Sequence, residues 1–261
     1  MTDAATMVRR NLRHTVRNPS AIIMTVALPV LLLLLFVGVF GDALKAGSGA
    51  GSGAGAGRGP GDYIDYLVAG VLIMTVGYGA TTTALAVNRD MTAGIINRFR
   101  TTAIARSAVL TGHVVGSAAR TLLSAALVIA VALGLGFRPG GDALRWLGAA
   151  GLLTLLTVAL TWLGVAVGLA SPTAEGTGPF TLVVQLLPFL SSAFVPPAAM
   201  SGPVRWFAAH EPYTPVIDAL RGLMLGTPVG HDGVIAVLWC LALAAVGYLW
   251  ATLLFRRDPN R

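Results

Sequence analysis

This 261-residue sequence contains six long windows without a charged side chain, and they constrain its fold more than any other feature. A helix of about 20 apolar residues is long enough to cross the hydrocarbon core of a bilayer. Soluble domains carry roughly 25% charged residues, whereas this chain has 11%, too few to cover a globular surface. We therefore predict an all-α integral membrane protein with six transmembrane helices, in the windows 21–40, 66–88, 121–137, 146–174, 176–204 and 233–255.

Basic residues fall unequally on the two sides that these helices define. With the N-terminus in the cytoplasm, eleven arginines are cytoplasmic and six basic residues are on the outer side. Cytoplasmic loops carry such an excess, so we predict that both chain ends are cytoplasmic. The net charge of +7 then faces anionic lipid headgroups, and no nucleic-acid partner is expected. The eleven residues are Arg9, Arg10, Arg13, Arg17, Arg89, Arg98, Arg100, Arg106, Arg256, Arg257 and Arg261.

Residues 1–19 have the pattern of an amphipathic helix that lies in the membrane interface. On a helical wheel, an apolar stripe of three turns is opposite a basic face. Such a helix binds the headgroup plane with its apolar side inward. A positively charged flank that only fixes topology is the alternative interpretation. The basic face consists of Arg9, Arg10, Arg13 and Arg17.

Two connections differ strongly in composition. Residues 41–62 are dominated by near-alternating glycine, which cannot pack a core and predicts a flexible outer loop. Residues 88–106 form the longest cytoplasmic connection and mix apolar and basic side chains. A loop that only joins two spans needs fewer residues, so we predict a short element that docks a cytoplasmic partner. Its candidate coupling residues are Gly94, Ile95, Ile96, Arg98, Phe99 and Arg100.

The connection between the fifth and sixth windows has its own helix signals. Prolines crowd the end of the fifth window, and Thr214 can cap a helix that starts at Pro215. Asp218 and Arg221 are spaced to pair at i, i+3, and Gly226 can end the helix. We predict a re-entrant or outer amphipathic helix here, after a broken span.

Two glycine pairs have the spacing that allows helices to approach closely in membranes. They are Gly112-x-x-x-Gly116 and Gly164-x-x-x-Gly168. With 32 glycines in the chain, chance spacing is at least as good an explanation.

The sequence lacks the residue patterns of a catalytic or cofactor site. Its four histidines are far apart, its single cysteine rules out a cysteine-rich metal cluster, and no paired carboxylates lie inside the windows. A P-loop requires a lysine after its glycine turn, whereas Lys45 precedes the glycines. We expect no catalytic, metal or cofactor site, and we expect that a separate protein supplies any energy from ATP.

Several segments together resemble the permeases of type-2 ABC exporters, in particular the daunorubicin-resistance branch. The most specific are residues 92–100 (TAGIINRFR) and 104–112 (IARSAVLTG), in the cytoplasmic connection. Weaker similarities are LPVL at 28–31, VFG at 39–41 and ALRG at 219–222. The family usually has Leu-Pro where this sequence has Thr102 and Ala103, which leaves the geometry of the connection open.

The resemblance implies one transmembrane permease domain over residues 1–261 in the bacterial plasma membrane. Its implied partners are two cytoplasmic ABC ATPase subunits that bind the ATP, a second permease copy or paralogue, and the bilayer. The implied activity is export of a small hydrophobic or amphipathic compound, such as a drug, an antibiotic or a lipid. An ATP-independent channel, carrier or scaffold is the alternative, and a membrane enzyme ranks last.

Overall fold

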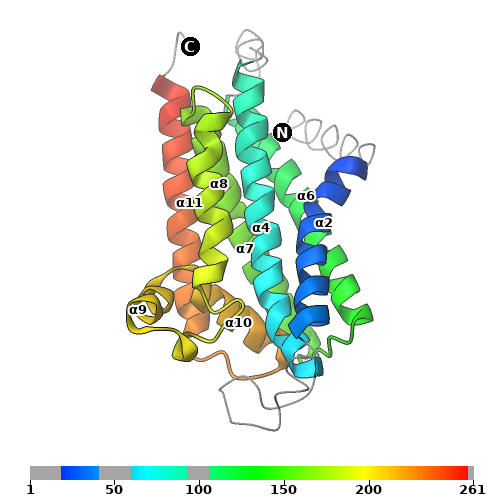
Figure 1. Cartoon of the computed structure of the whole chain (residues 1–261). Helices are drawn as coiled ribbons and strands as arrows, with labels where there is room; N and C mark the ends of the chain where they lie inside the picture. The colour runs from blue at the N-terminus through cyan, green and yellow to red at the C-terminus, as the bar shows by residue number, and fades with distance from the viewer. Residues whose placement is uncertain (1–18, 41–59, 93–105, 258–261) are drawn as a thin grey trace.

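Long helices packed side by side form the part of the chain that the computed structural model describes, residues 19–40, 60–92 and 106–257. Every regular element in these ranges is helical. Two short helices, α9 and α10, lie at one end of the bundle, which we call the α10 end (Figure 1). In chain order the elements are α2 (Pro19–Leu35), η1 (Phe36–Phe40), α4 (Pro60–Thr92), α6 (Arg106–Gly134), α7 (Ala143–Ala170), η2 (Glu175–Thr177), α8 (Gly178–Leu186), η3 (Leu187–Leu190), η4 (Pro197–Ala199), α9 (Gly202–His210), α10 (Tyr213–Leu225) and α11 (Asp232–Arg257).

Four helices among the described residues are long and apolar enough to cross a membrane. They correspond to the second, third, fourth and sixth windows, and a shorter apolar helical stretch, Val26–Gly38, runs from α2 into η1. The third helix differs most in length, because α6 begins at Arg106 and not near residue 121. The uncharged window began after Arg120, which lies within the helix and donates from Nη2 to the Ser117 hydroxyl at 2.9 Å. The four spans are Tyr63–Thr92, Leu110–Gly134, Ala143–Ala170 and Asp232–Phe255.

The fifth window, 176–204, is not one helix. α8 ends at Leu186, the chain tightens into η3, and a turn leads to η4 and α9. Proline at positions 188, 196 and 197 lacks an N–H and cannot continue the helical ladder, which is the physical reason for the division. The predicted break within this window is therefore present, and the segment after it folds into two short helices, α9 and α10, instead of one.

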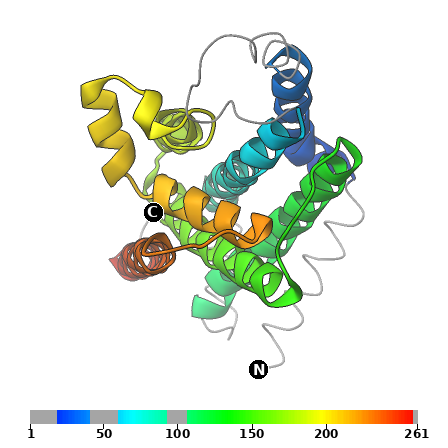
Figure 2. The same ribbon diagram turned by 90° about the horizontal axis from the view of Figure 1, so that it is seen from below.

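Helix α7 is central in the described bundle and contacts α4, α6, α10 and α11. Two glycines let it approach α4 closely. A Cβ atom at Gly164 would lie 2.5 Å from the Ala80 carbonyl oxygen, and one at Gly168 would lie 2.5 Å from that of Ala84. Of the two explanations offered for this glycine pair, close helix approach and chance spacing, the structure therefore favours close approach. Figure 2, from the α10 end, shows α10 crossing over the ends of the long helices.

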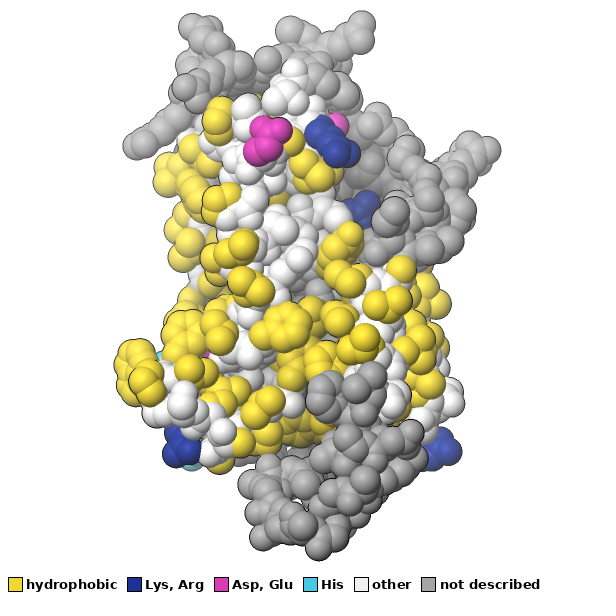
Figure 3. Space-filling view, viewed as in Figure 1, with side chains coloured by type: hydrophobic (Ala, Val, Ile, Leu, Met, Phe, Trp, Pro, Cys, Tyr) yellow, Lys and Arg dark blue, Asp and Glu magenta, His cyan; other side chains and the backbone are white. Residues whose placement is uncertain are grey.

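Apolar side chains dominate the exposed flank of the bundle. In Figure 3 they form a broad field between the two ends, and most of the visible charged side chains of the described residues are near the ends. The exposed residues include Leu123 and Leu127 on α6 and Leu238 and Leu249 on α11. Soluble monomers rarely expose apolar area on this scale. The flank therefore requires an apolar solvent.

Candidate functional site

The most connected polar side chain of the described residues is Arg221, on α10. Its Nη1 lies 2.7 Å from Asp218 Oδ1, so the pair predicted from i, i+3 spacing is present. Its Nη2 donates to the Ser192 carbonyl at 2.9 Å and to the Tyr66 carbonyl at 3.2 Å. The guanidinium also stacks 3.8 Å from the centre of the Tyr66 ring. Arg221 thereby fastens α10 to α4 and to the turn after η3.

Ser192 completes this network from the turn after η3. Its hydroxyl donates to Asp218 at 2.8 Å, and its carbonyl accepts a 2.7 Å bond from the Tyr66 hydroxyl. Its N–H donates to the Thr214 hydroxyl at 3.1 Å. The non-helical backbone at Ser192 is buried, and these bonds satisfy it. Burial raises the pKa of Asp218, although the Arg221 guanidinium acts in the opposite direction.

Glu211 caps α10, and the expectation that Thr214 would do so is wrong. The helix begins at Tyr213, and the Glu211 carboxylate accepts bonds from the N–H groups of Tyr213 and Thr214. A carboxylate is favourable at a helix N-terminus, where N–H groups lack helical partners. Burial raises the pKa of Glu211 to about 7, although the two backbone bonds oppose that shift. The other end is as predicted, because Gly226 adopts a left-handed conformation with φ of 78°.

A second group of polar contacts is near the ends of α4 and α6 that border residues 93–105. His113 Nε2 lies 3.3 Å from Asp90 Oδ2. The hydroxyls of Thr83 and Ser117 share a hydrogen bond between the same two helices. Asn88 donates to the Ser171 carbonyl at 2.7 Å, which fixes α4 to the end of α7. These contacts hold three helices together at the end of the bundle opposite α10.

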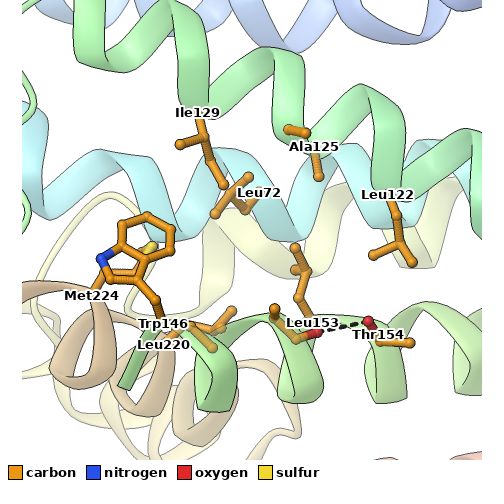
Figure 4. A pocket seen from close by; sticks show the side chains of 12 residues that line it. Leu72, Leu122, Ala125, Ile129, Trp146, Leu153, Thr154, Leu220 and Met224 are labelled. Atoms are coloured by element: carbon orange, nitrogen blue, oxygen red, sulfur yellow. Dashed lines mark hydrogen bonds between the residues drawn. The ribbon is translucent and has the colours of Figure 1, made fainter. Parts of the chain in front are cut away.

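A cavity of about 260 Å³ lies between α4, α6, α7 and α10. Figure 4 shows side chains of these four helices converging on it. Thr154 is the only hydroxyl-bearing residue of its wall, and it donates to its own helix at Ala150 O, at 2.6 Å. Its lining residues are Leu72, Leu122, Ala125, Ala126, Ile129, Trp146, Ala149, Ala150, Leu153, Thr154, Leu220 and Met224.

Three predicted segments lie wholly or largely outside the described residues, and what was expected of them stays a prediction. Residues 1–18 contain the expected interfacial helix, with Arg9, Arg10, Arg13 and Arg17. Most of the glycine-rich loop 41–62 is outside as well, and α4 already begins at Pro60. Of the loop 88–106, α4 takes the residues up to Thr92, and the coupling residues Gly94, Ile95, Ile96, Arg98, Phe99 and Arg100 are outside.

Within the described ranges, no group of three or more His, Cys, Asp or Glu side chains could hold a metal ion. The polar clusters fasten helices to one another, and the long helices present apolar flanks. This arrangement defines a multi-pass helical membrane protein.

Comparison with known proteins gives the family. The profile of the ABC-2 type transporter family matches residues 2–225, and the chain belongs to this family. It is 28% identical to the daunorubicin resistance ABC transporter permease protein DrrB1 of Streptomyces coeruleorubidus, over 98% of this chain and 88% of that protein. It is 26% identical to the probable doxorubicin resistance ABC transporter permease protein DrrC of Mycobacterium tuberculosis, over 65% of this chain and 64% of that protein. The protein is thus a multi-pass ABC transporter permease of the bacterial plasma membrane.

Proposed function

We propose that this chain is the permease subunit of an ATP-driven exporter for a hydrophobic or amphipathic compound such as a drug, an antibiotic or a lipid. The observation that carries the proposal is the family match over residues 2–225, on a chain whose described helices have the apolar flanks of a membrane bundle. The names of the relatives support this substrate class, since one is called a daunorubicin resistance permease and the other a probable doxorubicin resistance permease. The substrate crosses through the permease, and ATP is hydrolysed on partner subunits.

The proposed topology has six crossings with both chain ends in the cytoplasm. In support, the start of α2 and the end of α11 lie at the same end of the bundle (Figure 1). The fifth crossing would consist of α8 and η3, whose 13 residues rise only about 21 Å. The buried turn around Ser192 and Ala193 would complete that crossing, covered by protein as non-helical backbone in a membrane must be.

Cysteine labelling in whole cells tests this topology. In a Cys240→Ser background, Gly230→Cys at the α10 end should react with a membrane-impermeant maleimide from outside. Thr92→Cys, at the other end, should react only after the membrane is permeabilised. The reverse pattern would overturn the proposed orientation and leave the family assignment intact.

The proposed partners are two ABC ATPase subunits, docked on residues 94–100, and a second copy or paralogue of the permease. The described neighbours of that segment suit the transmission of force. Asp90 and His113 join α4 to α6, and Asn88 joins α4 to α7. A push on the segment between α4 and α6 would therefore reach three helices. A partner shifts such an equilibrium only through different contacts in two permease states.

The docking role is tested by purifying the chain together with an ABC ATPase, which is to be sought in the reading frames next to its gene. Arg98→Ala with Phe99→Ala should weaken assembly and uncouple ATP hydrolysis from substrate. The matched control is Arg205→Ala with Phe207→Ala, which removes the same two side-chain types at the α10 end. Normal coupling in the first variant would refute the docking site. Transport by the chain without any ATPase would favour the alternative, an ATP-independent carrier or channel.

A further inference from the structure

The cavity between α4, α6, α7 and α10 offers a ligand almost no polar partner. Among its 12 lining residues, only Thr154 and Trp146 carry a side-chain polar atom, and the Thr154 hydroxyl is already bonded to Ala150 O. Burying a polar group without a hydrogen bond is unfavourable. The walls therefore select an uncharged hydrocarbon.

The cavity has a buried floor and an exposed mouth. Leu72, Leu220 and Met224, which line its floor, are each 1% exposed. Ala126 and Ala150 also line it, and both are exposed on the surfaces of α6 and α7. The small methyl side chains of these two alanines leave an opening between the helices.

The mouth opens within the membrane-crossing part of the bundle. Ala126 lies eight residues before the end of α6 at Gly134, which places it about 12 Å along the helix axis from that end. Its exposed neighbours are apolar, including Leu123 and Leu127 on α6 and Leu147 on α7. The molecules in front of the mouth are thus the hydrocarbon chains of the bilayer.

The size of the cavity favours a chain segment over a whole drug-sized molecule. A dry apolar cavity of about 150 Å³ binds benzene, and drug-sized ligands occupy pockets of about 300–1,000 Å³. At about 260 Å³, the cavity has room for part of an alkyl chain while the rest of the lipid stays in the bilayer.

We propose that this cavity binds the acyl chain of a bilayer lipid, which enters between α6 and α7. This site goes beyond the proposed export function and does not depend on it. Its floor includes two residues of α10, the helix that Arg221 fastens to α4. An inserted acyl chain therefore packs against the side of α10 that faces the bundle. The lipid composition of the bilayer then affects how stably α10 is held against α4.

Photolabelling of the full chain in phosphatidylcholine vesicles tests the site. The vesicles contain a phosphatidylcholine with a diazirine in its acyl chain, and labelled positions are mapped by peptide mass spectrometry. We expect label on Leu72, Leu220 or Met224, which a lipid outside the bundle cannot reach. Ala126→Phe with Ala150→Phe should block the mouth and abolish that label, while Leu127 stays labelled. The matched control is Ala130→Phe with Leu147→Phe, at exposed positions that do not line the cavity, and it should keep the floor label.

Three results would overturn the proposal. One is label confined to exposed residues of α6 and α7 in the unmodified chain. Another is loss of the floor label when doxorubicin is added, which would assign the cavity to a transported compound. The third is a disulfide-linked dimer of Ala126→Cys in a Cys240→Ser background, which would assign the mouth to a second copy. If the doubly blocked variant does not fold, Ala126→Phe alone gives the same comparison.

Discussion

Helices α4 and α11 are both long enough to cross a membrane, but α4 lies inside the described bundle and α11 lies on its outside. Inside the described bundle, 83% of an apolar 18-residue stretch of α4 is buried, against 22% of the corresponding stretch of α11. The inner helix is the less apolar of the two and buries hydroxyl and amide groups at Thr75, Thr83 and Asn88. The outer helix exposes residues such as Leu238. In lipid, apolar surface gives no preference for the interior, and close packing and polar contacts hold helices together. Hydropathy therefore finds a span without telling which helix is central.

The largest expected effect comes from separating α4 from α7. Gly164→Leu would drive a side chain into the backbone of α4, since even a Cβ there lies 2.5 Å from Ala80 O. Because backbone cannot yield as a flexible side chain does, we expect more than about 3 kcal/mol of destabilisation, seen as loss of the monodisperse peak in size-exclusion chromatography. Gly151→Leu on the same helix has open space around it and should fold normally. If both variants behave alike, α4 is not held by this contact.

The next effect concerns the N-terminus of α10, whose first residue, Tyr213, is buried in the same cluster as Cys240 of α11. Burial raises the pKa of Glu211 to about 7, above the ordinary value of about 4.3. A raised carboxyl pKa gives stability that is present below the unfolded value and lost as the pH rises through the folded value. The free energy of unfolding, obtained from thermal melts in detergent, should therefore decrease between about pH 4.5 and 7, by about 3 kcal/mol.

Glu211→Gln keeps one hydrogen-bond acceptor at the cap and cannot ionise. It should flatten most of that pH dependence, leaving the part due to Asp218, whose pKa is also raised. An unchanged slope in the Gln variant would show that Glu211 is not the titrating group.

A pair of leucine truncations addresses the comparison of α4 and α11 directly. Leu67 on α4 is fully buried and Leu238 on α11 is 61% exposed. Leu67→Ala leaves a cavity and should destabilise the protein by about 2 kcal/mol. Leu238→Ala leaves a site that lipid or detergent refills, so its effect should be within about 0.5 kcal/mol. Equal losses in thermal melts would mean that α11 has a partner on its outer face.

The smallest effect is the coupling between Asp218 and Arg221, which holds α10 on the α4 side. A double-mutant cycle with Asp218→Asn and Arg221→Gln should give a coupling free energy of about 1 kcal/mol, because the pair is partly exposed. The Arg221 variant alone should cost more, since it also removes the bonds to Tyr66 and Ser192. Zero coupling in this cycle would mean that the bonds from Arg221 to the two backbone carbonyls, and not its pairing with Asp218, hold α10 in place.

Local signals in the sequence predicted four long apolar helices, the Asp218–Arg221 pair and the helix end at Gly226, because each depends on residues that are near one another in the sequence. The structure of the fifth window was harder to predict, since an apolar composition does not distinguish a continuous helix from a broken one. Tyr66 and Ser192 escaped prediction because they are 126 residues apart and meet only in the folded bundle. Glu211 was missed because a carboxylate two residues before a helix is a less usual cap than a threonine hydroxyl.

The glycine seam between α7 and α4 also bears on how the molecule can move. At Gly164 and Gly168 the two backbones are too close for a Cβ atom, so a shift of one helix along the other would bring larger side chains to a contact that has room only for glycine. The two helices therefore behave mechanically as a single stiff beam. Any rocking movement that opens and closes a passage has to move α4 and α7 together as one rigid body. The displacement then occurs at their contacts with the other helices.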